Sequence, residues 1–285
     1  MKFARLGEPG KEQPAVQPGD SASPGTWYSI AGLTADMSGD FLASDGVRRT
    51  REALAAGRLP EIPDAGNLRM GPPVTRPGAV VGIGLNYAGH AAESGAAVPD
   101  VPVVFLKPSN TVAGPYDDAR LPPSSLKFDW EVELAVVIGR PVSYLPSVAD
   151  ADAAVAGYVL ANDLSERDYQ LGGAAGQWVK GKSLPGSTPL GPYFVPADDL
   201  DATRLRLRTW VNGELRQDSS TADLIFGVPE LVHHLSQYMV LEPGDVILTG
   251  TPEGVALSGR FPYLRAGDVL ELEAEGLGRQ RQMLR

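Results

Sequence analysis

The sequence contains no cysteine, which excludes disulfide bonds, thiolate metal sites and a cysteine nucleophile. It also has no run approaching the roughly 18 apolar residues that a membrane-spanning helix requires. The first residues lack the apolar core of a signal peptide. We therefore expect a cytoplasmic protein with no membrane partner.

Basic clusters are absent as well. The formal net charge is −10, and the densest basic run is the alternating set Arg204, Arg206 and Arg208. Non-specific nucleic-acid binding requires a positive surface, so this class of protein is disfavoured. The sequence also lacks the Gly-x-Ser-x-Gly, Walker and His-Glu-x-x-His motifs, which leaves little support for a serine hydrolase or a zinc protease.

The order of apolar runs and turn signals predicts an α+β, mainly β fold. Residues 1–70 form a block without catalytic character, and we expect a small N-terminal domain there and a catalytic domain over residues 71–285. Strands outnumber helices and do not alternate with them regularly, which disfavours a doubly wound sheet. Strands are predicted at residues 2–6, 27–30, 79–84, 101–107, 128–139, 155–160, 204–211 and 245–249, helices at 46–56, 149–156 and 228–239, and a loop at 174–192.

The predicted strand at residues 128–139 carries three carboxylates, those of Asp129, Glu131 and Glu133. Alternate residues of a strand share a face, so all three point the same way. Unpaired buried carboxylates are costly, and a hard divalent cation such as Mg²⁺, Mn²⁺ or Ca²⁺ would relieve that cost. An edge strand with a solvated acidic face explains the pattern equally well.

Asp163 closes another apolar strand and supplies a third oxygen donor beside Glu131 and Glu133. Taken alone, an aspartate at such a place is more typical of a helix cap or a turn. Three carboxylates leave octahedral positions open for water and for a chelating substrate, as catalysis requires. Asp129 lies at the strand entrance, where we expect it behind the ligands or exposed.

His90 and Glu93 are three residues apart in a segment that could form a helical turn. A carboxylate beside an imidazole orients it and raises its basicity, the arrangement of a general base. The alternative is an ordinary pair on a helix surface. His233 and His234, the only other histidines, lie within an amphipathic helix pattern and are interpreted as structural.

Two lysines and two glycine motifs are more ambiguous. Lys107 and Lys182 each stand at a strand-to-loop break, although a lysine is most often a solvated surface residue. Residues 248–254 could present backbone N–H groups to an anion or could form a plain turn. Gly82 and Gly84 suggest a dinucleotide fingerprint, but a tyrosine replaces its third glycine, so that motif is set aside.

Several segments together resemble the fumarylacetoacetate hydrolase family, in the family's order, from about residue 71 to about residue 275. The N-terminal block and residues 71–73 look most like the branch of ureidoglycolate lyase-like and diketo-deoxyrhamnonate hydrolase-like enzymes. One departure is the stretch 183–188, where the family commonly has an aromatic residue and an Asp-Thr-Phe run, so the substrate and the support of Lys182 are uncertain. The segments are residues 84–93, 104–108, 129–139, 162–170, 181–183, 211–214 and 241–255.

The resemblance implies a rolled mixed β-sheet core, a homodimer, and Mg²⁺ or Mn²⁺ in the site with Ca²⁺ as a substitute. It implies Glu131, Glu133 and Asp163 as metal ligands, His90 with Glu93 as the water-activating pair, and Lys182 as the cation that steadies negative charge. The residues it places along the substrate are Asn86, Tyr87, Lys107, Arg167, Gln170, Gly250 and Thr251.

The function expected from this resemblance is hydrolysis of a carbon–carbon bond in a small anionic 2-oxo acid, namely a 2,4-diketo acid or acylpyruvate, through a metal-stabilised enolate. A lyase, a decarboxylase or a keto–enol isomerase would use the same enolate. A metal-binding protein with little catalysis is a further alternative, but such a protein has no need for the oriented base of His90 and Glu93.

Overall fold

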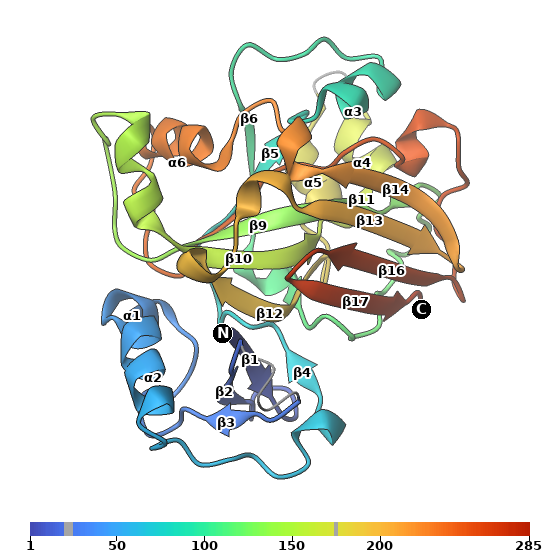
Figure 1. Cartoon of the computed structure of the whole chain (residues 1–285). Coiled ribbons are helices and arrows are strands. Elements are labelled where there is room, and N and C mark those ends of the chain that lie inside the picture. The colour runs from blue at the N-terminus through green and yellow to red at the C-terminus, as the bar shows by residue number, and fades with distance from the viewer. Residues whose placement is uncertain (20–24, 174–175) are drawn as a thin grey trace.

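The computed structural model describes residues 1–19, 25–173 and 176–285, and strands dominate it (Figure 1). The large sheet contains β1 (Lys2–Leu6), β2 (Gln13–Gln17), β3 (Tyr28–Ser29), β4 (Met70–Gly71), β5 (Val80–Gly84), β6 (Val103–Lys107), β7 (Val112–Ala113), β9 (Val132–Ile138), β10 (Val155–Asn162), β12 (Thr188–Pro196) and β15 (Val246–Leu248). The smaller sheets contain β8 (Phe128–Asp129) with β11 (Ser165–Glu166), and β13 (Arg206–Val211), β14 (Glu214–Ser220), β16 (Val269–Ala274) and β17 (Gly278–Met283). The α-helices are α1 (Gly39–Ala43), α2 (Gly46–Ala55), α3 (Ala88–Glu93), α4 (Arg167–Leu171), α5 (Trp178–Lys182) and α6 (Val228–Ser236).

The large sheet follows the order β3-β2-β1-β12-β10-β9-β15-β5-β6, with β4 beside β1 and β7 beside β12. Most neighbours are antiparallel, but β15 and β5 run parallel, so the sheet is mixed. A second sheet with the order β14-β13-β16-β17 packs near β9 and β10, and their apolar faces share one core. The predicted α+β, mainly β fold is confirmed.

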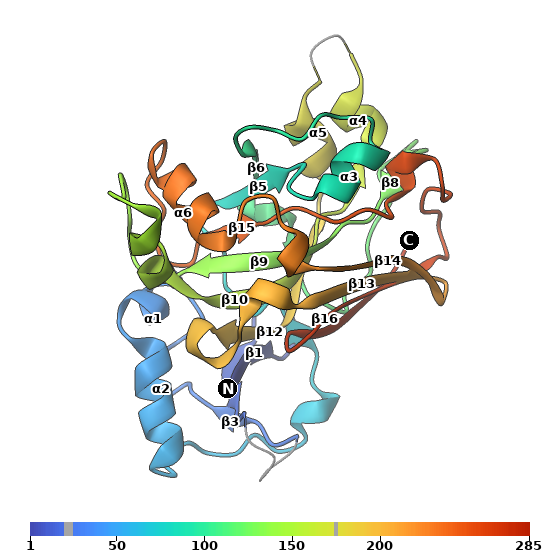
Figure 2. The ribbon, with the colours of Figure 1, turned by 45° about the horizontal axis from the view of Figure 1, so that its top comes forward.

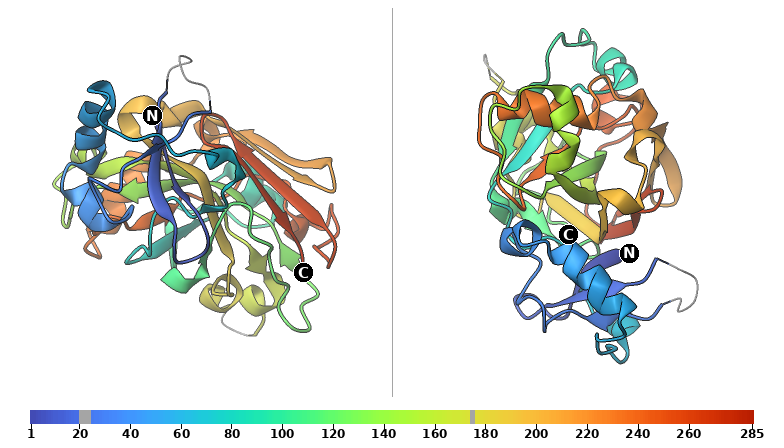
Figure 3. Two further views of the ribbon diagram at one scale, coloured as in Figure 1. Left: turned by 90° about the horizontal axis from the view of Figure 1, so that it is seen from below. Right: turned by 60° about the vertical axis from the view of Figure 1, so that its left-hand side comes forward.

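The N-terminal strands belong to the same large sheet because β1 pairs with β12, with Phe3 opposite Phe194. Phe3 also packs edge-on against Phe41 of α1, at a centroid distance of 5.9 Å. Helices α1 and α2 and strands β2 and β3 project together to one side of the body (Figure 3). The sheet therefore runs across the predicted boundary at residue 70, and the division into two domains stays a prediction.

Strand β9 lies in the interior of the large sheet between β10 and β15, and all of its residues are buried. The alternative of a solvated edge strand is therefore wrong. The predicted strand over residues 128–139 is interrupted at Trp130 and Glu131, so Asp129 belongs to β8 in a separate small sheet. Because the backbone changes course there, Asp129 does not share the strand face of Glu131 and Glu133.

Two other local predictions are wrong. The expected helix at residues 149–156 consists of two 3₁₀ turns, Val148–Asp150 and Asp152–Ala154, followed directly by β10. The expected loop at residues 174–192 contains α5 and the start of β12; residues 174 and 175 of this stretch lie outside the described residues. In both stretches, packing against neighbouring elements decides the conformation rather than local sequence pattern.

Helices α3, α4 and α5 gather at the end of the molecule opposite the N-terminal region (Figure 2). Helix α3 follows β5 in sequence, and α5 contacts both α4 and β6. No helix among the described residues has the length and apolar character needed to cross a membrane. The arrangement places three short helices above the carboxylate strand.

Candidate metal and catalytic site

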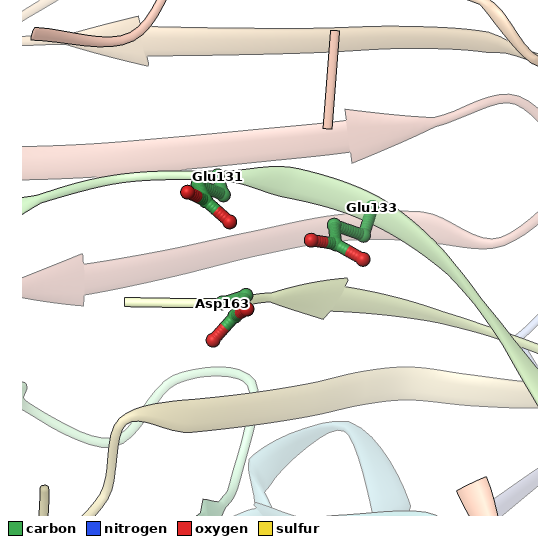
Figure 4. A group of neighbouring side chains, drawn as sticks. All are labelled: Glu131, Glu133 and Asp163. Carbon is green, nitrogen blue, oxygen red and sulfur yellow. The ribbon is translucent and has the colours of Figure 1, made fainter. Parts of the chain in front are cut away.

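The register of β9 and β10 brings three carboxylates together. Ala161 lies opposite Glu133 and Asn162 opposite Val132. One residue further, the Asp163 N–H donates a 2.9 Å hydrogen bond to the Glu131 carbonyl. One carboxylate oxygen from each of Glu131, Glu133 and Asp163 lies within 4.8 Å of the others. Figure 4 shows the three groups turned toward a common space. All three are buried, so their negative charges require compensation.

Three buried cations supply most of that compensation. Lys182 Nζ donates to Glu131 Oε2 at 2.6 Å and to Asp163 Oδ2 at 2.8 Å. Lys107 Nζ donates to Asp163 Oδ1 and to the carbonyl of Ser187. Arg167 Nη1 lies 2.7 Å from Glu131 Oε1. Glu131 and Asp163 are therefore paired, whereas no lysine or arginine among the described residues contacts Glu133.

Asp129 holds Arg167 in place rather than joining the carboxylate group. Its side chain is completely buried and accepts the Arg167 Nε–H at 2.8 Å and the backbone N–H groups of Ala256 and Leu257 at 2.9 Å. Arg167 Nη1 also donates to Gln170 Oε1 at 2.9 Å. Asp129 thus orients the guanidinium whose Nη1 contacts Glu131, and it is buried rather than exposed.

The surroundings shift the pKa values of Glu131 and Glu133 in opposite directions. Burial acts to raise the pKa of Glu131, but Lys182 and Arg167 outweigh it and lower that pKa to about 2. Burial raises the pKa of Glu133 well above 4.5, and the charges of Asp163 and Glu131 add to the rise. Among the described residues, the Glu133 carboxylate accepts one hydrogen bond, from the Gly250 N–H at 2.7 Å. A divalent cation fits here, because it would supply the positive charge that Glu133 lacks and find three carboxylate ligands.

His90 and Glu93 form the predicted pair on α3. His90 Nδ1 lies 3.0 Å from Glu93 Oε1, and the Gly254 N–H donates to both Glu93 oxygens at 3.0–3.1 Å. Gly254 has a φ of +101°, and a Cβ there would lie 2.2 Å from the carbonyl oxygen of Arg216, so only glycine fits this turn. The pair leaves the second imidazole nitrogen, Nε2, available for proton transfer.

A cavity of about 230 Å³ joins the dyad to the charged cluster. His90, Glu93, Glu131 and Lys182 line it, and so do three of the predicted substrate residues, Arg167, Gln170 and Thr251. The other four do not line it. They are Asn86 and Tyr87, both fully buried, Lys107 behind Asp163, and Gly250 behind Glu133.

The side chain of Asn86 links two loops through hydrogen bonds. Its amide donates to the carbonyls of Phe226 and Thr249 at 3.0 and 2.8 Å and accepts from the Phe226 N–H. The Tyr87 hydroxyl has no hydrogen-bond partner among the described residues, and burial raises its pKa. The substrate-binding roles of these two residues stay predictions without support from the cavity.

The altered stretch after Lys182 still supports that lysine. The Ser187 hydroxyl donates to the Lys182 carbonyl at 2.9 Å, and the Ser187 carbonyl accepts from Lys107 at 3.0 Å. At Gly181, an added Cβ would lie 2.5 Å from both the Gln170 Cβ and the Glu166 carbonyl oxygen, so α5 needs glycine to pack against α4. The Ser187 hydroxyl therefore holds the Lys182 backbone, and the close packing of Gly181 fixes the helix that carries Lys182.

Buried amide side chains that the sequence did not point to tie the second sheet to the site. Gln217 of β14 accepts the Val132 N–H at 3.1 Å and donates to Thr251 Oγ1 at 2.9 Å. Asn162 accepts the Glu131 N–H at 3.3 Å and donates to Gln282 of β17. Phe105 and Trp178 line the cavity as well. The strand that carries Gln217 is polar except for Leu215, so its sequence holds no signal that could have indicated this residue.

A metal-compatible carboxylate cluster beneath a histidine–glutamate pair, within a mixed sheet, is the architecture of a metal-dependent enzyme. Residues 79–285 match the family described as fumarylacetoacetate (FAA) hydrolase C-terminal. A protein of Burkholderia multivorans named as a hydrolase is 43% identical over 289 residues, covering 100% of this chain and 99% of the relative. The chain therefore belongs to the fumarylacetoacetate hydrolase family.

Solved structures of two relatives carry more specific names. The 5-carboxymethyl-2-hydroxymuconate delta-isomerase of Mycobacterium smegmatis is 34% identical, with a TM-score of 0.77, and the match covers 100% of this chain and 98% of that one. The maleylpyruvate hydrolase of Sphingobium sp. SYK-6, in complex with manganese(II) and pyruvate, is 28% identical, with a TM-score of 0.79 and the same coverage. Enzymes similar to this chain thus include both hydrolases and isomerases.

Proposed function

We propose that this chain is a divalent-metal-dependent hydrolase that cleaves a carbon–carbon bond in a small acylpyruvate or other 2,4-dioxo acid. The observation that carries the proposal is the position of the His90–Glu93 pair, which lines the same cavity as Glu131, Arg167 and Lys182. An oriented base, a carboxylate metal ligand and two cations therefore face one small volume. The reaction consumes one water and yields pyruvate and a carboxylic acid.

Glu131, Glu133 and Asp163 would hold the metal, as Mg²⁺ or Mn²⁺, with Ca²⁺ as a substitute in vitro. When bound, the cation supplies Lewis acidity toward the 2-oxo acid group. The Sphingobium relative, solved with manganese(II) and pyruvate, supports this choice of metal and of ligand class.

The protein's own residues perform the proton transfers. Glu93, fixed by the Gly254 N–H, orients His90, which takes a proton from water through Nε2. The resulting hydroxide adds to the distal carbonyl, and the bond between that carbon and C3 breaks. The electron pair of that bond passes to the pyruvate half as an enolate, and Lys182 stabilises its charge. His90 then returns the proton to C3, which completes pyruvate.

Arg167 is suited to bind the substrate carboxylate. Its Nη2 is buried and has no hydrogen-bond partner among the described residues, although the side chain lines the cavity. An orphaned guanidinium N–H is costly unless an acceptor reaches it, and a carboxylate is the acceptor that Arg favours most. Asp129, which accepts from Arg167 Nε, fixes the position of the guanidinium.

The same dyad could instead move a proton between carbon atoms, which is the chemistry of a keto–enol or double-bond isomerase. The similarity to the Mycobacterium isomerase favours this second candidate. A lyase or a decarboxylase would use the same site, and a metal-binding protein without turnover would need only the carboxylates. The oriented His90 argues against the last of these.

A panel of substrates with product identification tests the proposal. The protein is incubated with Mg²⁺ and with an acylpyruvate, oxaloacetate or a 2-hydroxymuconate-type diene. Pyruvate with a carboxylic acid indicates hydrolysis, CO₂ indicates decarboxylation, and a shifted absorbance without cleavage indicates isomerisation. We expect the first result; binding of Mg²⁺ with no turnover of any substrate would refute an enzymatic role.

Three finer expectations stay predictions. They are the ureidoglycolate lyase-like or diketo-deoxyrhamnonate hydrolase-like branch, a homodimer, and a cytoplasmic location. Activity toward the substrates of that branch, the mass of the protein in solution, and fractionation of the source cells would test them in turn.

A further inference from the structure

The cavity is lined by ionisable residues and by large apolar residues. Five of its lining residues are ionisable, namely His90, Glu93, Glu131, Arg167 and Lys182. Others form what we call the apolar wall: Leu85, Phe105, Leu171 and Trp178. Lys182 lies beside both groups of residues, since its Nζ contacts Glu131 and also lies 5.2 Å from the centroid of the Phe105 ring.

The two aromatic residues of the wall have room because of two glycines in β5. A Cβ on Gly82 would lie 2.2 Å from the Phe105 ring, and a Cβ on Gly84 would lie 2.1 Å from the Trp178 indole. Phe105 and Trp178 contact each other with centroids 5.7 Å apart at an interplanar angle of 60°. The glycine pair that suggested a dinucleotide fingerprint instead admits aromatic side chains to the cavity.

No unpaired cation among the described lining residues faces the apolar wall. The two cations that line the cavity, Arg167 and Lys182, both contact Glu131 at what we call the charged end. Lys182 Nζ also lies over the Phe105 ring, but it is already paired with Glu131 and Asp163. A carboxylate held against the wall would lose water without gaining a counter-charge, which costs several kcal/mol. A hydrocarbon group there gains about 0.8 kcal/mol for each CH₂ that it buries.

From these contacts we infer that the end of the substrate that lies against Phe105 and Trp178 is uncharged and apolar, so the enzyme prefers 2-oxo acids with a short hydrocarbon tail to dicarboxylates. This inference rests on the proposed function, because it assumes that the charged end binds the 2-oxo acid group. A volume of about 230 Å³ falls below the roughly 300–1,000 Å³ of typical ligand sites, so the tail is short.

The inference can be tested without turnover. 2-Oxopentanoate and 2-oxoglutarate have the same chain length and differ only in a terminal methyl or carboxylate, and neither has a bond that the proposed reaction cleaves. Their affinities are measured by calorimetry with saturating Mg²⁺. We expect 2-oxopentanoate to bind at least about tenfold more tightly, the discrimination typical of an apolar pocket. Equal affinity, or tighter binding of 2-oxoglutarate, would overturn the inference.

Two matched variants test whether the apolar wall is the source of the selectivity. Leu171 lines the cavity and is 45% exposed, so Leu171→Arg places a cation on the wall at low risk to folding. We expect the preference for 2-oxopentanoate to fall about tenfold in this variant. Leu215 on β14 is 48% exposed and does not line the cavity, so Leu215→Arg should leave the preference unchanged. A preference that survives Leu171→Arg would overturn the assignment to this wall.

A parallel measurement separates the inference from the proposed function. Butanoylpyruvate and succinylpyruvate form the corresponding pair of cleavable substrates, and we expect a higher kcat/KM for the former. Hydrolysis of both at equal rates would refute the selectivity and leave the proposed function intact. Absence of both binding and turnover would refute the proposed function, and the inference with it.

Discussion

The protein contains two clusters of opposed charges that differ in how completely they are paired. The first, which we call the N-terminal ion cluster, consists of Arg5, Glu12, Asp36, Arg69 and Asp117, and each of its carboxylates contacts a guanidinium. The second is the buried site cluster of Glu131, Glu133, Asp163, Lys107, Lys182 and Arg167. There Glu133 contacts none of the three cations, although it lies in the same group as Glu131 and Asp163.

The difference in pairing matters because the two clusters also differ in how far they are buried. In the N-terminal ion cluster the side chains of Asp36 and Asp117 are 28% and 32% exposed, so water shares in their solvation. In the site cluster Glu133 and Asp163 are at most 1% exposed. A partly wet cluster can stabilise a fold by pairing alone, whereas a dry cluster with an unpaired carboxylate calls for a further cation. Incomplete pairing, not the number of charges, distinguishes the functional cluster.

Glu133→Gln gives the sharpest test of this comparison, since it removes the unpaired charge and preserves the side-chain shape. We expect turnover with Mg²⁺ to fall about 1,000-fold or more, because a metal contributes several kcal/mol to such reactions. Mg²⁺ affinity, measured by calorimetry, should fall at least about 100-fold. The unfolding free energy without metal should not fall, because the lost charge is not paired.

The matched control for that change is Glu12→Gln in the N-terminal ion cluster, where the glutamate contacts Arg5 and Arg69. It should leave Mg²⁺ affinity unchanged and lower stability instead. Equal Mg²⁺ affinity of the Glu133→Gln variant and the wild type would remove Glu133 from the metal site.

His90→Ala separates the base from the metal. We expect kcat to fall at least about 100-fold, the contribution usual for a positioned general base. Mg²⁺ affinity should stay within about twofold, since His90 contacts Glu93 and none of the three carboxylates through a hydrogen bond. Steady-state kinetics with calorimetry on the same preparation measures both. Unimpaired turnover would refute the role of His90 in activating water.

Lys107→Met breaks the pairing of the site cluster at its most buried point. Lys107 and Asp163 are both 0% exposed at their side chains, so removing the cation should lower the unfolding free energy by about 3 kcal/mol. Mg²⁺ should restore more stability to this variant than to the wild type, because the ion supplies the missing charge near Asp163. Urea unfolding with and without Mg²⁺ measures the difference.

The corresponding change in the N-terminal ion cluster, Arg69→Met, should cost only about 1 kcal/mol, because Arg69 is 24% exposed. Mg²⁺ should restore none of it. If Mg²⁺ stabilised both variants to the same degree, the ion would not be acting at Asp163.

The strands that the sequence predicted correctly are those whose own residues are enough to favour a strand. The apolar runs of β5, β9 and β10 were predicted within a few residues, because a continuous β-branched stretch favours a buried strand in any context. The break at Trp130 and Glu131 could not be predicted in this way. At the break, the Trp130 indole N–H donates to the Gly254 carbonyl at 3.2 Å, a contact with a residue 124 positions away in sequence.

The candidate site shows the same limit. Glu131 and Glu133 were predicted together from strand alternation, but Asp163 joins them only through the pairing of β9 with β10. The three buried cations had no local signal that distinguishes them from surface lysines and arginines. Gln217 was missed because its function depends on how the second sheet packs against Val132 and Thr251.

The smallest expected effect concerns Asp36 of the N-terminal ion cluster. Burial acts to raise its pKa, but the hydrogen bonds from Arg5 and from the Met37 N–H outweigh it, so its pKa is lowered from 3.8. A carboxyl with a lowered folded-state pKa stabilises the fold above the unfolded pKa and loses that contribution as the pH falls through the folded value. Asp36→Asn should therefore cost about 1 kcal/mol at pH 7, and urea unfolding should show the cost shrinking below pH 4. A cost that stayed constant with pH would show that shape, not charge, makes Asp36 stabilising.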